Sequence, residues 1–278
     1  MRAVLSSVAI AIALVLGSAG CFGTPTPLDP AIQGSVGVPH HGVITNAARL
    51  PNKGTGFARL KSNDARWGNP RLVALVEAAA AEVARERPGG APLMIGDLSP
   101  RWGGASSGHH SHRTGRDADL LIFVTTLDGR PVRSPGFLRF GPDGLAETDD
   151  HHYVRIDLER EWALVKALVT SREASVQWLF FAHWLEALVI EYARARGEDP
   201  ELLWHAESVL LQPGDSAAHD DHLHLRIACS PDEAVAGCLG GGPYWSWIPE
   251  LPQLVSPPDD ELAEAILGDA GEPRQVRR

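Results

Sequence analysis

The stretch HSHRTGRDADLLIF, residues 110–123, places two histidines and two aspartates directly before an apolar run. Histidines and acids are poor material for a hydrophobic core, because burying an unpaired charge is costly. Thr114 and Gly115 suit a turn, and the apolar residues that follow Asp119 suit a strand. The stretch therefore predicts a strand, rooted in the sheet, with ionisable side chains at its start.

A second group of histidines, HDDHLH at residues 219–224, also leads into an apolar run. Side chains two positions apart in a strand point to the same face, so we expect His222 and His224 to share a face. On its own this pair also fits two polar residues on a solvated face. The segments 107–119 and 219–224 together hold six of the twelve histidines. A catalytic zinc takes three N or O ligands and keeps a fourth position open, and His112, Asp119 and His224 supply such a set.

Composition and motifs exclude several function classes. The chain has 278 residues, is 44% hydrophobic and carries a formal net charge of −10. This length and apolar content suffice for a substantial core, whereas the acidity argues against a nucleic-acid partner. The sequence contains neither a phosphate-cradling glycine loop nor a His-Glu-x-x-His motif.

Periodicity and capping signals predict a mixed fold. Helices are expected at residues 69–90, 157–171, 184–199 and 200–211, and strands at 91–99, 117–126, 176–181 and 219–229. The helices and strands are interspersed without a regular βαβ rhythm. We therefore expect an α+β fold, in which a small antiparallel sheet carries the metal site and helices flank it.

The ends of the chain predict export and loose segments. Residues 1–21 combine one positive charge with an almost uncharged apolar run, which is typical of a signal peptide; the alternative is an N-terminal membrane anchor. The sequence GSAGC also fits a lipoprotein cleavage box loosely, with Cys21 as the lipidated residue, although Ser18 stands where leucine is preferred. We expect a flexible segment at 22–46, a metallopeptidase domain at 47–250 and a mobile tail at 251–278.

Two further cysteines, Cys229 and Cys238, flank a short loop. An even pair at this spacing in an exported protein predicts a disulfide, and the alternative is two unpaired thiols.

The segments SGHHSHRTGRDAD and HDDHLH together resemble the penicillin-insensitive murein endopeptidases. These belong to a wider group of peptidoglycan metallopeptidases that share His-x6-Asp followed much later by His-x-His. Ser111, Gly115 and Asp119 match the spacing around the first ligands, and MIGDLSPRWGG at residues 94–104 is also similar to that family. The resemblance covers about residues 50–249.

The resemblance implies a zinc ion, Zn2+, bound by His112, Asp119 and His224, with His109 matching an additional histidine close to the metal. His110 stands where a small residue is usual, so the sequence leaves open which of these two neighbours faces the metal.

The resemblance also implies catalytic roles. His222 would act on the attacking water or the oxyanion, and His219 fills a third imidazole position that can share proton transfer. Asp117 is expected either to orient a ligand imidazole or to make an ordinary strand-edge hydrogen bond. For a second metal, Asp149 and His152 are candidates, and the alternative is an acidic loop tip.

The function that the resemblance implies is hydrolysis of peptide cross-links in peptidoglycan, of the D-alanyl–meso-diaminopimelyl type, by a periplasmic zinc endopeptidase. Contact with a membrane is expected only through an N-terminal lipid. Two alternatives remain: a D-alanyl-D-alanine carboxypeptidase or dipeptidase of the same group, and a non-catalytic, zinc-stabilised module that binds the cell wall.

Overall fold

The computed structural model describes residues 33–106, 108–214, 216–240 and 245–250. The predicted signal peptide, Cys21 and the predicted tail at 251–278 lie outside these residues. Among the helices of the described part, none has the length and apolar character needed to cross a membrane.

Five helices in the described residues follow the sequence signals closely. They are α2 (Pro70–Glu86), α3 (Leu158–Thr170), α4 (His183–Ala195), α5 (Pro200–Val209) and α6 (Pro231–Val235). Side-chain caps fix three of the predicted helix starts: Asn69 accepts from the Arg71 amide, Asp157 from Arg160, and Asp199 from Glu201 and Leu202. The four helices predicted from the sequence are confirmed, and α6 is an additional short helix.

The central sheet has seven strands in the order β14-β13-β15-β8-β7-β5-β4. Their bounds are β4 (Lys53–Gly54), β5 (Phe57–Arg59), β7 (Leu93–Ile95), β8 (Asp117–Leu120), β13 (Val176–Phe180), β14 (Leu210–Leu211) and β15 (Leu223–Ile227). Neighbouring strands are antiparallel except for the pairs β13–β14 and β5–β7. The α+β prediction is confirmed, and the sheet is larger than expected and partly parallel.

Three smaller sheets complete the described part of the chain. One has the order β10-β9-β12-β11, formed by β9 (Val124–Thr126), β10 (Pro131–Val132), β11 (Leu145–Glu147) and β12 (Tyr153–Ile156). The other two are pairs: β1 (Gly34–Val38) with β2 (His41–Thr45), and β3 (Ala48–Arg49) with β6 (Trp67–Gly68). The predicted strand at 117–126 is therefore divided between two sheets.

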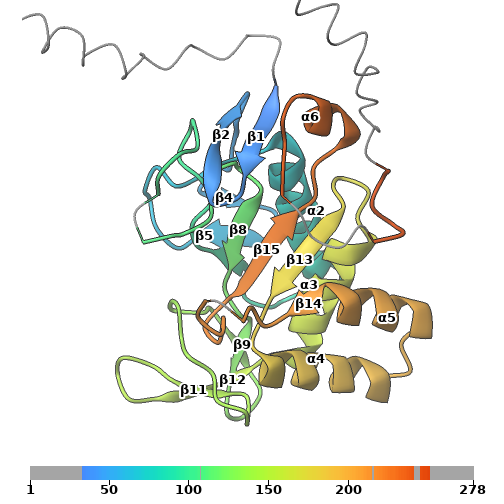
Figure 1. Ribbon diagram of the computed structural model, residues 1–278. Helices are drawn as coiled ribbons and strands as arrows, with labels where there is room; N and C mark the ends of the chain where they lie inside the picture. The colour runs from blue at the N-terminus through green and yellow to red at the C-terminus, as the bar shows by residue number, and fades with distance from the viewer. Residues whose placement is uncertain (1–32, 107, 215, 241–244, 251–278) are drawn as a thin grey trace, which may run out of the picture. The chain divides into compact units, whose positions relative to one another are not determined.

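The two faces of the central sheet have opposite chemistry. Leu223, Leu225 and Leu120 are completely buried in the main hydrophobic core, which also takes up the apolar sides of the helices. Figure 1 shows α2 and α3 behind β8, β15 and β13. The alternate residues of β15 and β8 point to the other face, so the polar side chains of both strands gather there.

The prediction of a flexible segment at 22–46 is wrong for residues 34–45, which form the β1–β2 hairpin. Ser35 and Ile44 are buried, and the Ser35 hydroxyl donates to the Thr114 carbonyl at 2.7 Å. The Gly37 amide donates to the Gly237 carbonyl at 2.8 Å, and its own carbonyl accepts from Leu239. These long-range bonds hold the hairpin, and the local glycine-rich composition gave no sign of them.

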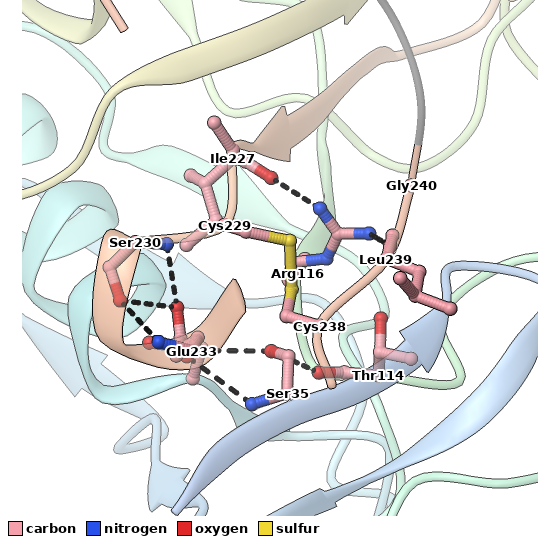
Figure 2. Close-up of a disulfide and its surroundings, with 12 residues drawn as sticks. Ser35, Thr114, Arg116, Ile227, Cys229, Ser230, Glu233, Cys238, Leu239 and Gly240 are labelled. Carbon is pink, nitrogen blue, oxygen red and sulfur yellow. Dashed lines mark hydrogen bonds between the residues drawn. A yellow bond between two sulfur atoms is a disulfide. The ribbon is translucent and has the colours of Figure 1, made fainter. Parts of the chain in front are cut away.

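The disulfide between Cys229 and Cys238 is present, with the two Cα atoms 6.0 Å apart, so that prediction is confirmed. It closes the loop that carries α6, as Figure 2 shows. The buried Arg116 guanidinium lies beside it and donates to the Leu239 carbonyl at 2.6 Å and to Ile227 at 3.4 Å. The loop is thereby fastened to the end of β15 and the start of β8.

Candidate metal centre

Strand pairing brings the two halves of the site together. In the antiparallel register of β15 and β8, His224 lies opposite Asp119 and Arg226 lies opposite Asp117. Directly opposed residues of an antiparallel pair share a face of the sheet, so all four side chains meet on the face that the helices leave free. Segments more than a hundred positions apart thus form one site.

His112 reaches this site from the turn before β8. Its backbone has φ +62°, a left-handed conformation that non-glycine residues adopt at a cost, and the turn continues through Gly115 at φ +73°. The His112 ring is fully buried, its Nδ1–H donates to the Leu98 carbonyl at 3.1 Å, and its Nε2 lies 3.1 Å from Asp119 Oδ1. The bond to Leu98 fixes the tautomer, so the Nε2 lone pair faces Asp119.

His224 is oriented in the same way by a carboxylate. Its Nε2–H donates to Asp117 Oδ1 at 2.9 Å, which leaves the Nδ1 lone pair 3.3 Å from Asp119 Oδ1. Burial opposes ionisation of Asp117, but the nearby Arg226 and His224 outweigh burial and hold its pKa far below the usual range. Asp117 therefore orients His224, as one of the two sequence interpretations expected.

The spacing of these atoms fits a divalent ion. Two ligands of a tetrahedral zinc ion with bonds of about 2.0–2.1 Å lie about 3.3 Å apart. The separations of 3.1 and 3.3 Å between Asp119 Oδ1 and the two ring nitrogens agree with that value. Among the described residues, His112 Nε2 and both Asp119 oxygens are buried without a hydrogen-bond partner. A cation would satisfy all three atoms at once.

The electrostatics of the buried pair favour the charged carboxylate. Burial alone would raise the pKa of Asp119, but His112, His222 and His224 hold it well below the usual range. Burial likewise opposes a charge on His112, while Asp119 and Asp117 outweigh it and raise the pKa of that ring. Asp119 is thus ionised at neutral pH, the state in which a carboxylate can bind a metal ion.

His222 and His219 also lie at the site, and their surroundings differ. His222 Nε2 lies 3.3 Å from Asp119 Oδ1, and its Nδ1–H donates to Asp221 Oδ1 at 2.6 Å. Burial lowers the pKa of His222, but these two carboxylates outweigh burial and raise it to about 9. Burial and the neighbouring rings of His224 and His222 lower the pKa of His219 to about 4. His219 also has a left-handed backbone, with φ +56°.

His109 is the member of the histidine pair that faces the cluster. Its Nδ1 lies 3.9 Å from Asp119 Oδ2 and its Nε2 lies 3.3 Å from Asp97 Oδ2, whereas His110 is exposed. The ligand atoms converge in two groups of three, within 4.8 Å in each: His109, His112 and Asp119, and His219, His222 and His224. All six side chains are those that the two sequence segments had put forward.

Asp149 and His152 are not brought to this site. Both lie in the exposed turn between β11 and β12, where His152 Nδ1 is 3.2 Å from Asp150 Oδ2. Within the described residues the structure gathers no group of three ligands around them.

Sequence reasoning missed three residues that hold the histidines. Asp221 fixes His222, Asp97 fixes His109, and the Phe137 ring packs edge-on against His222 with centroids 5.3 Å apart. Asp221 is adjacent to His222 in HDDHLH, so the sequence could have pointed to it as a partner of that histidine. Asp97 and Phe137 lie in other segments, and only the tertiary fold shows their roles.

Comparison with known proteins shows which family this chain resembles over most of its length. A family model described as penicillin-insensitive murein endopeptidase matches residues 35–139, which include His109, His112 and Asp119. A protein of that name from Haemophilus influenzae is 26% identical over 272 residues, covering 87% of this chain and 85% of its own. Another, from Escherichia coli O139:H28, is 30% identical over 236 residues, covering 82% of this chain and 80% of its own.

Proposed function

Because the chain belongs to the penicillin-insensitive murein endopeptidase family, we propose that it is a zinc-dependent enzyme that hydrolyses peptide cross-links in peptidoglycan. The bond that the family resemblance implies is the D-alanyl–meso-diaminopimelyl cross-link. One observation supports the proposal: Asp119 Oδ1 lies 3.1 Å from His112 Nε2 and 3.3 Å from His224 Nδ1, and it is buried without a hydrogen bond from the described residues.

His112, Asp119 and His224 hold the ion in this proposal. A zinc ion held there supplies Lewis-acid polarisation of the scissile carbonyl and lowers the pKa of a coordinated water from about 15.7 toward about 7. Leu98 and Asp117 hold the two imidazoles in the ligating tautomer. This fixed orientation keeps the donors in place before substrate arrives.

In this proposal His219 and His222 share the proton transfer steps. The pKa of His219 is low and its Nδ1–H donates to the Ala217 carbonyl at 2.8 Å, so its Nε2 is free to accept a proton from water. Asp221 accepts from the Nδ1–H of His222, so its Nε2 is directed at the site, from which a proton on Nε2 would stabilise the oxyanion or pass to the leaving amine. Neighbouring groups whose pKa values are pushed apart are typical of an acid and base pair.

Export completes the proposal. A murein endopeptidase must reach the cell wall, which agrees with a cleaved signal peptide at 1–21 and a periplasmic location. The disulfide between Cys229 and Cys238 supports an oxidising compartment. Whether the mature chain begins with a lipid on Cys21 is decided by mass spectrometry of the secreted protein, which would show a diacylglyceryl mass.

The decisive experiment is digestion of a purified cross-linked muropeptide dimer, with and without a chelator. The wild-type protein is expected to release monomers, and chelation to abolish this. His222→Ala should retain zinc and lose on the order of 10²–10⁴-fold in kcat, because it removes a proton-transfer group. His183→Ala, which removes an exposed histidine of α4, is the matched control and should behave as wild type.

Other outcomes would redirect the assignment. Trimming of terminal residues without release of monomers would indicate a carboxypeptidase. Binding to cell walls with no turnover at all, and no change in His222→Ala, would indicate a zinc-stabilised binding module.

A further inference from the structure

A row of aromatic rings begins beside the metal centre on the free face of the sheet and leads away toward α5. The Phe180 ring contacts His224 with centroids 5.4 Å apart, and Trp178 stacks on Phe180 at 6.1 Å. Trp245 contacts Trp178 at 5.7 Å and stacks on Trp247 at 5.2 Å. All four rings of this aromatic row, from Phe180 to Trp247, are only partly buried. Trp245 and Trp247 also pack against the main core, and each of the four rings keeps part of its surface accessible.

The row ends in an open pocket between α5 and residues 246–247. The pocket encloses about 490 Å³, within the range of about 300–1,000 Å³ that is usual for small-molecule sites. Its walls include the Trp247 ring and the Trp204 side chain, which is 52% exposed and meets Trp247 edge to face at 5.3 Å. Thr170, Asp199, Glu201 and Ser246 supply polar groups around these rings.

Two polar atoms of the pocket lack partners. In the part of the chain that the structure describes, His205 Nε2 and Trp247 Nε1 are buried and make no hydrogen bond. The His205 ring lies against Trp247 with centroids 3.9 Å apart. An unpartnered buried polar group is costly, so a site that leaves two of them together is suited to a ligand with its own donors and acceptors.

We propose that this pocket is a subsite for the amino-sugar rings of the peptidoglycan glycan strand. An uncharged sugar ring has apolar C–H faces that pack on indole and a rim of hydroxyl and amide groups that hydrogen-bond to Asp199, Glu201 and Ser246. Two of the three ionisable groups of the pocket, Asp199 and Glu201, are acidic, and burial lowers the pKa of the third, His205. This charge distribution disfavours an anionic ligand.

The aromatic row also fits the peptide stem that joins the sugar to the cross-link. The inference rests on the proposed function, in which the metal centre cuts a bond within the peptide stems. Neighbouring ring centroids in the row lie 5.2–6.1 Å apart. Three such contacts can span no more than a stem of four or five extended residues, which reaches about 13–18 Å.

Binding of an uncharged tetrasaccharide of N-acetylglucosamine, measured by calorimetry, tests the pocket directly. The full-length wild-type protein should bind it, and Trp204→Ala should weaken binding roughly tenfold, since one stacking face is lost. Trp204→Phe should recover part of the affinity. Tyr153→Ala removes an equally exposed aromatic side chain from β12 and should have no effect. No binding by the wild-type protein would overturn the proposal.

A kinetic comparison links the pocket to catalysis. For Trp204→Ala, the ratio of kcat/KM for a sugar-bearing cross-linked dimer to kcat/KM for the same dimer without sugars should fall roughly tenfold, through KM. An equal loss on both substrates would mean that the pocket binds peptide and would overturn the proposal. If neither dimer is cut by the wild-type protein, the proposed function fails, while tetrasaccharide binding still decides the subsite on its own.

Discussion

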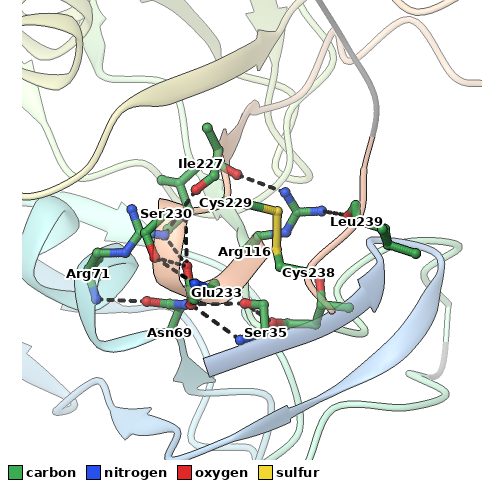
Figure 3. A network of polar contacts seen from close by, with 12 residues as sticks. Ser35, Asn69, Arg71, Arg116, Ile227, Cys229, Ser230, Glu233, Cys238 and Leu239 are labelled. Atoms are coloured by element: carbon green, nitrogen blue, oxygen red, sulfur yellow. Dashed lines mark hydrogen bonds and ion pairs between the residues drawn. A yellow bond between two sulfur atoms is a disulfide. The ribbon is translucent and has the colours of Figure 1, made fainter. Parts of the chain in front are cut away.

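Two buried polar clusters of the same domain differ in how completely their hydrogen-bonding groups are paired. In the first cluster, Glu233 accepts hydrogen bonds on both carboxylate oxygens, from Ser35, Asn69, Arg71 and Ser230 (Figure 3). In the second cluster, the candidate metal centre, both Asp119 oxygens are buried without a hydrogen bond from the described residues.

The difference separates a structural role from a functional one. The Glu233 cluster joins β1, the start of α2 and the disulfide loop, and all of its bonding capacity is used within the chain. The candidate metal centre instead leaves both Asp119 oxygens and His112 Nε2 buried without a hydrogen bond from the described residues, which costs stability unless something binds there. The first cluster should therefore control folding, and the second should control metal binding and turnover.

The largest expected effect comes from Asp119→Asn. The change removes the charge that the proposed ion requires, so bound zinc and hydrolysis should both be lost, the latter by on the order of 10³-fold or more. The stabilisation by added zinc, about 4 kcal/mol at a concentration of ~1,000 times Kd, should disappear as well. Zinc content by mass spectrometry, muropeptide digestion and urea unfolding with and without zinc measure the three effects.

Asp128→Asn, in the exposed turn between β9 and β10, is the matched control and should keep all three properties. An Asp119→Asn protein that retains zinc and turnover would break the comparison, because the unpartnered atoms would then have no role in binding.

Glu233→Ala should give the opposite pattern. Removing a buried acceptor that serves four neighbours should lower the free energy of unfolding by about 3 kcal/mol, since Arg71 and the Ser35 amide lose their partner. The additional stabilisation by zinc and the kcat of the folded protein should stay. Urea unfolding with and without zinc measures the first two quantities, and Glu82→Ala on the exposed surface of α2 is the control.

The residues of the candidate metal centre could be predicted from the sequence, whereas the Glu233 cluster was not predicted. The His-rich segments and strand alternation were sufficient to put forward His112, Asp119 and His224, because their spacing is a local property. The helix caps and the disulfide were also readable, since each depends on residues close together in the chain. The strand register that sets His224 opposite Asp119 came only from the structure.

What could not be predicted depends on contacts between distant segments. The β1–β2 hairpin contains four glycines or prolines that read as a flexible segment, yet its bonds to Gly237 and Thr114 hold it in place. The left-handed backbone of His112 and His219 was equally unreadable, because nothing in a histidine marks it for positive φ. The choice between His109 and His110 likewise required the fold.

The smallest expected effect concerns pH and the first cluster alone. Burial would raise the pKa of Glu233, but Arg71 and the hydrogen bonds from Ser230, Ser35 and Asn69 outweigh burial and lower it below the ordinary value of 4.5. A carboxyl whose folded pKa is depressed contributes stability that is fully present above its unfolded pKa and is lost as pH falls through the folded pKa.

The difference in unfolding free energy between wild type and Glu233→Gln, on the order of 1–2 kcal/mol at neutral pH, should therefore shrink below pH 4.5. The site histidines titrate alike in both proteins, so they cancel in this difference, which urea unfolding in excess chelator between pH 3 and 7 measures. A gap that stays constant as the pH falls would mean that the hydrogen bonds of Glu233 do not depend on its charge, and the complete cluster would then be only a packing feature.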